Sequence, residues 1–272
     1  MIRRIAILGF GKMGSWLARE LAKDRDKEVA AYDINAGNKI AIQKIATQAK
    51  NVMDIRQLND VSQLAQFKPE LLINAVSLQN TIPAFENAVK HLPKDCMIAD
   101  VASVKAGLAE FYRSCGFRFV SMHPMFGPVF ANMESLKEEN VVLIKESDSS
   151  GKEFFRDFFA NLGLRIFEYS FEEHDRMMAY SLTTPFAASL VFAACMEKNT
   201  VPGTTFARHR KIAKGLLSED DHLLAEILFN PNSAAQIEKI TAKLEFLKHI
   251  IRGRDYEEAK KFFNKLRKNL GE

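Results

Sequence analysis

Residues 5–14 read Ile-Ala-Ile-Leu-Gly-Phe-Gly-Lys-Met-Gly, and this stretch decides the fold. Its first four residues form a continuous apolar run, which is typical of a strand buried on both faces of a parallel sheet. Glycines follow at the G-x-G-x-x-G spacing, as Gly9, Gly11 and Gly14, and apolar residues then recur at helical spacing. The stretch therefore predicts a buried strand, a tight turn and a helix.

The glycine spacing and a later acidic residue together indicate a dinucleotide site. Gly9 permits the turn, Gly11 lets the backbone approach a pyrophosphate, and Gly14 lets the helix pack against the sheet. Asp33 lies 19 positions after Gly14, at the end of the next apolar strand. A carboxylate there accepts hydrogen bonds from the adenosine ribose and repels a 2′-phosphate, so NAD is expected rather than NADP.

Two alternatives stay open for this site. The pattern also fits a structural strand–turn–helix with a surface aspartate, and Arg3, Arg4 or Lys39 could serve a 2′-phosphate. The expected cofactor-binding residues are Gly9, Phe10, Gly11, Lys12, Met13, Gly14, Asp33 and Ser77.

Strand and helix patterns alternate along the first part of the chain. Further strands are expected at residues 28–32, 71–76, 97–101, 118–122 and 140–144, with helices near 82–91 and 107–115. This alternation predicts an α/β fold with a doubly wound, mostly parallel sheet. From residue 172 onwards the patterns are helical, including an apolar stripe over 237–251, so an all-α second domain is expected.

Composition excludes several classes of protein. The formal net charge of the 272 residues is only +4, which does not indicate a nucleic-acid binder. The three cysteines lie far apart and no metal-ligand spacing is present, so neither a disulfide framework nor a metal is expected. The N-terminus lacks the pattern of a secretory signal, and a cytoplasmic protein is predicted.

The segment 177–196 contains no charged residue and approaches the length that spans a bilayer. Its hydroxyl-bearing residues and Pro185 dilute its hydrophobicity. Burial in a protein core or at a subunit interface is therefore favoured over a membrane span, and a homodimer through the helical domain is predicted.

A second group of polar residues follows the later strands. Ser103 lies at the end of one predicted strand and His123 at the end of the next, so both should lie at the carboxyl edge of the sheet, beside the glycine loop. Histidine is the side chain most readily used as a base near neutral pH, and a neighbouring hydroxyl can fix its tautomer. The alternative for His123 is a structural histidine whose hydrogen bonds are satisfied.

These motifs resemble the prephenate and arogenate dehydrogenase family of tyrosine biosynthesis. The matching pieces, in chain order, are GFGKMG at 9–14, DVASVK at 100–105, HPMFGP at 123–128, His-Asp at 174–175 and ILFN at 227–230. The resemblance implies a Rossmann domain, placed here at 1–168, followed by an α-helical dimerisation domain at 169–272. Such a chain would be fully used, with no room for a fused mutase or regulatory domain.

The resemblance also implies a reaction, the oxidative decarboxylation of prephenate to 4-hydroxyphenylpyruvate. His123 resembles the histidine that draws the proton from the ring hydroxyl of the substrate, while hydride leaves the same ring carbon for the nicotinamide. Ser103 resembles the serine that positions this histidine, and Lys105 resembles a lysine that is structural or near the cofactor. Asp100 could equally cap the next helix.

The chain departs from the family pattern at two places. Many members carry a further histidine in the long helix, where this chain reads Ser-Leu-Thr-Thr-Pro-Phe at 181–186, and many clamp a substrate carboxylate with an arginine. Here Lys211 takes the place of that arginine with Arg210 adjacent and Arg208 nearby, so either Arg210 or Lys211 is the expected clamp. The alternative is that these cations form an exposed helix face.

The alternatives for the activity follow from these departures. Within the enzyme class the substrate could be arogenate, which would give tyrosine directly. In a different class the chain would be an inactive dinucleotide-binding regulatory protein. His174 is a weaker site candidate, because the acidic residues around it indicate a charged helix start.

Overall fold

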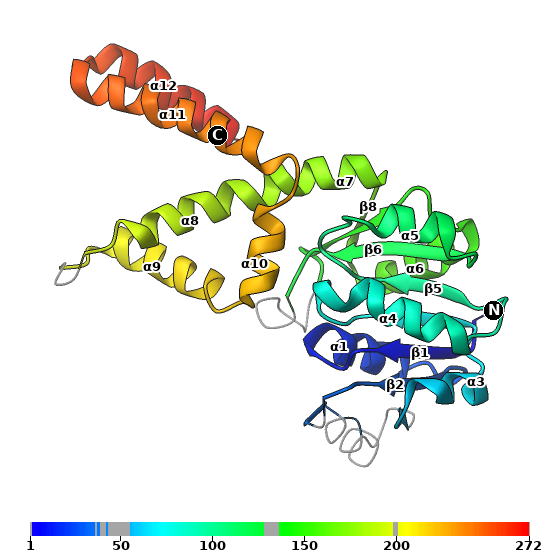
Figure 1. The fold of residues 1–272 in the computed structure, drawn as a ribbon. Coiled ribbons are helices and arrows are strands. Elements are labelled where there is room, and N and C mark those ends of the chain that lie inside the picture. The colour runs from blue at the N-terminus through cyan, green and yellow to red at the C-terminus, as the bar shows by residue number, and fades with distance from the viewer. Residues whose placement is uncertain are drawn as a thin grey trace. The chain divides into compact units, whose positions relative to one another are not determined.

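The computed structural model describes residues 2–35, 37–38, 42, 55–127, 136–197 and 201–271. An eight-stranded sheet in the order β3-β2-β1-β4-β5-β6-β7-β8 organises the N-terminal part of the chain (Figure 1). The strands are β1 (Arg4–Leu8), β2 (Glu28–Tyr32), β3 (Arg56–Leu58), β4 (Leu71–Asn74), β5 (Met97–Asp100), β6 (Phe119–Pro124), β7 (Asn140–Ile144) and β8 (Arg165–Tyr169).

All neighbouring strands are parallel except β6 and β7, so the predicted α/β class with a mostly parallel sheet is confirmed. The strand order reverses beside β1, which has β2 on one side and β4 on the other. This is the position at which doubly wound sheets bind ligands. The apolar pattern did not predict β3, which has three residues, or β8, which is half-exposed and carries the charged residues Arg165 and Glu168.

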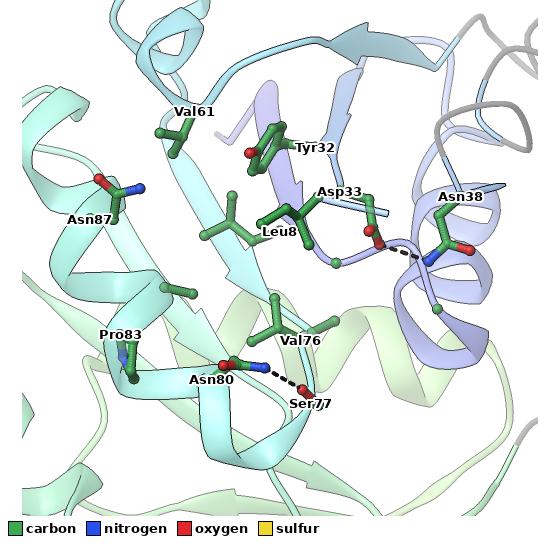
Figure 2. Close-up of a pocket in the computed structure, with 15 residues that line it drawn as sticks. Leu8, Tyr32, Asp33, Asn38, Val61, Val76, Ser77, Asn80, Pro83 and Asn87 are labelled. Carbon is green, nitrogen blue, oxygen red and sulfur yellow. Dashed lines mark hydrogen bonds between the residues drawn. The ribbon is translucent and has the colours of Figure 1, made fainter. Parts of the chain in front are cut away.

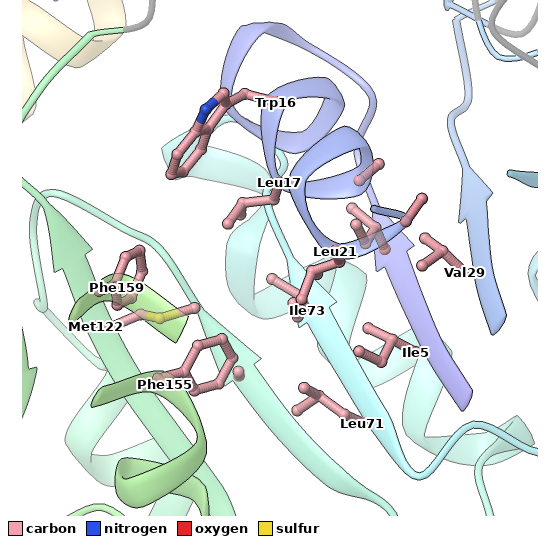
Figure 3. Close-up of a cluster of buried hydrophobic side chains, with 14 of the residues drawn as sticks. Ile5, Trp16, Leu17, Leu21, Val29, Leu71, Ile73, Met122, Phe155 and Phe159 are labelled. Atoms are coloured by element: carbon pink, nitrogen blue, oxygen red, sulfur yellow. The ribbon is translucent and has the colours of Figure 1, made fainter. Parts of the chain in front are cut away.

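Two hydrophobic clusters cover the two faces of the sheet. Ile5 and Ile7 of β1 point into the cluster that packs helices α1 (Lys12–Leu21) and α6 (Ser149–Asn161), which Figure 3 shows in part. The alternate residues of β1 point into the second cluster, with α3 (Leu64–Phe67), α4 (Thr81–Ala88) and α5 (Leu108–Ser114). The buried apolar run of β1 therefore reflects a strand that packs on both faces.

The chain divides into two compact units. One comprises Met1–Arg176 with Asp220–Glu226, and the other comprises Met177–Glu219 with Ile227–Glu272. The first unit also contains α7 (Phe171–Met178) up to Arg176. The predicted domain boundary at residue 168 stays a prediction.

All regular secondary structure in the described residues of the second unit is helical. Its elements are a π-helical segment η4 (Ala179–Thr183), α8 (Thr184–Ala194), α9 (Thr204–Leu216), the end of α10 (Asp221–Leu228), α11 (Ser233–Gly253) and α12 (Tyr256–Asn269). The Thr183 hydroxyl lies 2.7 Å from that of Ser233, and the Gln236 amide donates to Thr184 at 2.8 Å. These bonds join η4 and α8 to α11.

One helix in the described ranges, Phe171–Ala194, is long and apolar enough to cross a membrane by length and composition alone. The 18-residue stretch of this helix that is most apolar has a mean hydropathy of 1.4, and 22% of that stretch is buried. Most of the apolar surface of this helix is therefore not buried within the chain.

Candidate active site

A pocket of about 470 Å³ opens at the carboxyl ends of β1, β2 and β4. Four of the predicted cofactor-binding residues line it, namely Gly9, Gly11, Asp33 and Ser77. Figure 2 shows Asp33 with Asn38 on one side of the pocket and Ser77 with Asn80 on the other. Of the other predicted residues, Phe10, Lys12, Met13 and Gly14 are not in its lining.

The three glycines of the loop have different surroundings. Gly9 has a φ of +85°, and a Cβ there would come within 2.7 Å of the Ala75 carbonyl oxygen. A Cβ on Gly14 would overlap the carbonyl of Gly9, whereas a Cβ on Gly11 would meet nothing within 4 Å. The loop thus folds only with glycine at two positions and leaves open space in front of the third, as a bound pyrophosphate requires.

Asp33 is held rigidly at the edge of this pocket. Its carboxylate accepts hydrogen bonds from the Phe10 N–H at 2.6 Å, the Asn35 N–H at 2.7 Å and the Asn38 side-chain amide at 2.9 Å. A fixed negative charge at this position favours ribose hydroxyls over an added phosphate.

The cations considered for a 2′-phosphate do not support that alternative. Arg4 lies at the amino end of β1, where it pairs with Glu70 at 3.4 Å and donates to the Lys68 carbonyl. Arg3 also lies at that end, and its N–H donates to Glu70 at 2.5 Å. Both therefore lie at the sheet edge opposite the pocket, because β1 runs from Arg4 towards the glycine loop. Lys39 lies outside the described residues.

His123 is nearly buried and is the last residue but one of β6, at the carboxyl end of that strand. Its Nδ1 lies 3.1 Å from Nε2 of His174, a fully buried residue of α7. The Nδ1 of His174 in turn lies 3.1 Å from Oδ1 of Asp175. Ser103, half-buried after β5, makes no hydrogen bond to His123 in the described part of the chain.

The contact between His174 and His123 was not predicted from the sequence. The available signal was the His-Asp doublet at the start of a helix, which the flanking acidic residues obscured. Its partner His123 lies 51 positions earlier in the chain, so no local spacing could reveal the pair.

The surroundings keep both imidazoles neutral. Burial, the neighbouring His174 ring and the Lys105 ammonium hold the pKa of His123 well below its ordinary value of 6.5. Burial also lowers the pKa of His174, although its hydrogen bond to Asp175 opposes the shift. A neutral histidine has a ring nitrogen available to accept a proton, as a base requires.

A buried ion pair lies behind His123. The Lys105 ammonium contacts Asp100 Oδ1 at 2.6 Å and the Met122 carbonyl at 2.8 Å, and both charged side chains are fully buried. The Tyr112 hydroxyl donates to the second oxygen of Asp100 at 2.7 Å. Lys105 thus ties the end of β5 to the residue that precedes His123, which is a structural role.

The expected carboxylate clamp lies in the second unit. Arg208, Arg210 and Lys211 are exposed on α9, and within the described ranges none of them forms an ion pair. Their assignment as a clamp stays a prediction.

The chain matches the model of a known protein family. Residues 17–167 match the family model described as "Prephenate dehydrogenase, nucleotide-binding domain". The chain belongs to the prephenate dehydrogenase family. This confirms the resemblance inferred from the motifs, and the match begins after the glycine loop, which therefore remains separate evidence for nucleotide binding.

Two curated relatives align with nearly the whole chain. Arogenate dehydrogenase 1, chloroplastic, of Arabidopsis thaliana is 25% identical over 266 residues, which is 92% of this chain and 39% of that protein. A probable arogenate/prephenate dehydrogenase of Methanocaldococcus jannaschii is 22% identical and covers 97% of this chain and 60% of that protein. The chain thus spans less than two thirds of the length of either relative.

Solved structures of the family share the fold. Prephenate dehydrogenase from Aquifex aeolicus, in complex with hydroxyphenyl propionate and NAD+, superposes with a TM-score of 0.83 at 19% identity and covers 99% of this chain and 97% of that one. Synechocystis arogenate dehydrogenase gives a TM-score of 0.76 at 18% identity, with coverage of 98% and 99%. At these identities the likeness establishes the fold.

Proposed function

We propose that the chain catalyses the NAD-dependent oxidative decarboxylation of prephenate to 4-hydroxyphenylpyruvate. The observation that carries the proposal is the position of His123, which is nearly buried at the same carboxyl edge of the sheet as a nucleotide pocket, where burial holds its pKa well below 6.5. Arogenate is the second candidate substrate, because relatives of the chain are named arogenate dehydrogenases. Its product would be tyrosine.

NAD is the proposed cofactor, and when bound it supplies the acceptor for the hydride. Three features of the pocket fit it: the open space in front of Gly11, the fixed carboxylate of Asp33, and the start of α1 directly after the loop. The family relative from Aquifex aeolicus was crystallised with NAD+, which agrees with this assignment.

In this reaction His123 accepts the proton of the ring hydroxyl while the C–H bond of the same carbon breaks and its electron pair leaves as hydride. The bond to the ring carboxylate then breaks, carbon dioxide departs and its electrons make the ring aromatic. His123 returns the proton to the phenol oxygen, so the net reaction releases no proton. A base that is neutral near physiological pH can carry out both transfers.

Other residues are proposed for binding. Ser103 would hydrogen-bond the substrate near His123, and Arg210 or Lys211 would pair with the side-chain carboxylate of prephenate. A lysine gives charge without the two-pronged geometry of arginine, so the two candidates differ in the specificity that they can provide.

A homodimer formed through the helical unit is also proposed, as is a cytoplasmic location. Large apolar side chains are exposed on α8, α11 and α12, among them Val191, Leu244, Ile251 and Phe263. Exposed apolar surface of this kind is typical of an interface between subunits. Sedimentation of a stable monomer at micromolar concentration would contradict the dimer.

The activity is tested by following NADH formation with prephenate and with arogenate side by side, and each again with NADP in place of NAD. His123→Asn should reduce turnover by about 10²- to 10⁴-fold, which is the usual contribution of a general base, while NAD binding stays intact. No turnover of either substrate by a protein that binds NAD would refute the proposed function. Unchanged turnover in the variant would refute the role of His123.

A further inference from the structure

Three side chains of the first unit form a linear array: the Asp175 carboxylate, the His174 imidazole and the His123 imidazole. Each junction is 3.1 Å long, and the array uses both ring nitrogens of His174. The side chain of His174 is fully buried, whereas that of Asp175 is 24% exposed. The array therefore runs from a partly solvated carboxylate to the proposed base.

The chemistry of the three groups fixes where the protons lie. An ionised carboxylate only accepts hydrogen bonds, so Nδ1 of His174 must carry the proton that points to Asp175. Because a neutral imidazole has one donor and one acceptor, Nε2 of His174 is then an acceptor. It can pair with Nδ1 of His123 only if that nitrogen carries a proton, which leaves the lone pair of His123 on Nε2.

We propose that His174, held by Asp175, is a positioning residue that fixes His123 as the tautomer protonated on Nδ1, with Nε2 free to accept the substrate proton. The inference rests on the proposed function for its kinetic consequence. When Nε2 of His123 takes the proton, the imidazolium still donates through Nδ1 to His174. Asp175 then stabilises the extra charge through the intervening ring, as a carboxylate does in hydrolase triads.

The helix that carries His174, α7, is held in place at its first turn by hydrogen bonds and an ion pair. The Ser170 N–H donates to Glu173 at 2.8 Å and the Glu173 N–H donates to the Ser170 hydroxyl at 3.1 Å, which is a capping box at the start of α7. Glu173 also pairs with Lys145 of the turn after β7 at 2.6 Å. These contacts fix the first turn of α7, and with it the ring of His174.

Two substitutions of His174 separate positioning from mere packing. In His174→Gln the side-chain oxygen can take the place of Nε2 and accept from His123, whereas His174→Phe keeps a ring but removes the acceptor. We expect kcat to fall by about 10- to 100-fold in His174→Phe, since Nδ1–H of His123 then lacks a partner and the other tautomer becomes populated. In His174→Gln kcat should stay within about fivefold of the parent, and KM should change little in both variants.

Charge controls and a spectroscopic readout complete the test. Asp175→Asn should lower kcat, while Glu172→Gln, which removes a carboxylate from an exposed position on the same turn, should leave it unchanged. Heteronuclear NMR of the imidazole nitrogens should show His123 protonated on Nδ1 in the parent and a mixture of tautomers in His174→Phe. Fluorescence of the single tryptophan, Trp16, and NAD binding confirm that each variant is folded.

The inference is overturned if the parent carries the proton of His123 on Nε2, if His174→Phe turns over like the parent, or if His174→Gln is as impaired as His174→Phe. A parent that binds NAD but oxidises neither prephenate nor arogenate refutes the proposed function instead. The tautomer measurement still decides the role of His174 in that case, because it needs no turnover.

Discussion

Replacing Lys105 with methionine should destabilise the first unit strongly, although methionine fills a similar volume. Lys105 and Asp100 form a fully buried pair, so the substitution leaves the Asp100 carboxylate without its cation and the Met122 carbonyl without its donor. Removal of one partner of a buried ion pair costs about 3–5 kcal/mol of unfolding free energy. For a unit of this size that corresponds to a decrease of about 6–20 °C in Tm.

The unfolding is best followed by the fluorescence of Trp16, because it is the one tryptophan of the chain and lies in the core of this unit. Two variants test the reasoning. Tyr112→Phe removes one hydrogen bond to Asp100 and should cost about 1–3 kcal/mol. Adding Asp100→Asn to Lys105→Met neutralises the stranded carboxylate and should restore part of the loss.

A second readout comes from the base. Lys105 is one of the groups that lower the pKa of His123, so the acid limb of the profile of kcat/KM against pH should move to higher pH in Lys105→Met. A stability loss below about 1 kcal/mol, or a double variant no more stable than Lys105→Met, would refute the account of the buried pair. If the acid limb of the pH profile does not move in Lys105→Met, only the effect of Lys105 on the pKa of His123 is refuted.

Three other predictions follow from the described residues. Gly11→Ala should leave the midpoint of urea unfolding unchanged but weaken NAD binding in a calorimetric titration. Gly14→Ala should lower the midpoint of urea unfolding, because its Cβ overlaps a backbone carbonyl. Equal urea midpoints for the two variants would contradict the roles assigned to these glycines. Burial lowers the pKa of His123 below 6.5, so below that pH the unfolded chain binds more protons than the native chain. The free energy of unfolding should therefore fall as the pH decreases from about 6.5, and it should fall less steeply in His123→Asn. Burial raises the pKa of Cys96 to about 12, so a thiol reagent should modify the exposed Cys195 rapidly and Cys96 only after unfolding; rapid native labelling of both would contradict this.

The sequence predicted the sheet better at its centre than at its edges. The strands β1, β2, β4, β5, β6 and β7 were all predicted near their observed positions, because strands buried in the interior of the sheet are continuous apolar runs. The edge strands β3 and β8 were missed, since an exposed edge needs little hydrophobic pattern and the pairing with a neighbour decides it.

For the candidate site, the residues with local constraints were the predictable ones. Gly9 and Gly14 are required by a positive φ and by close packing, and Asp33 follows its strand directly, so spacing alone indicated a pocket there. From the sequence, it stayed open whether Arg4 serves a 2′-phosphate and whether Asp100 caps the next helix. The structure places Arg4 at the opposite sheet edge and pairs Asp100 with a buried lysine.

By itself, then, the sequence determined the parallel sheet, the glycine turn and the nucleotide pocket, because apolar runs and glycine geometry act over a few neighbouring residues. The tertiary structure alone decided which groups surround the proposed base. His123 meets His174 across 51 positions, and Lys105 meets the Met122 carbonyl across 17. Such contacts depend on how β5, β6 and α7 pack. Once packing has buried a polar side chain, it needs a hydrogen-bond partner, because a buried polar group without one costs free energy.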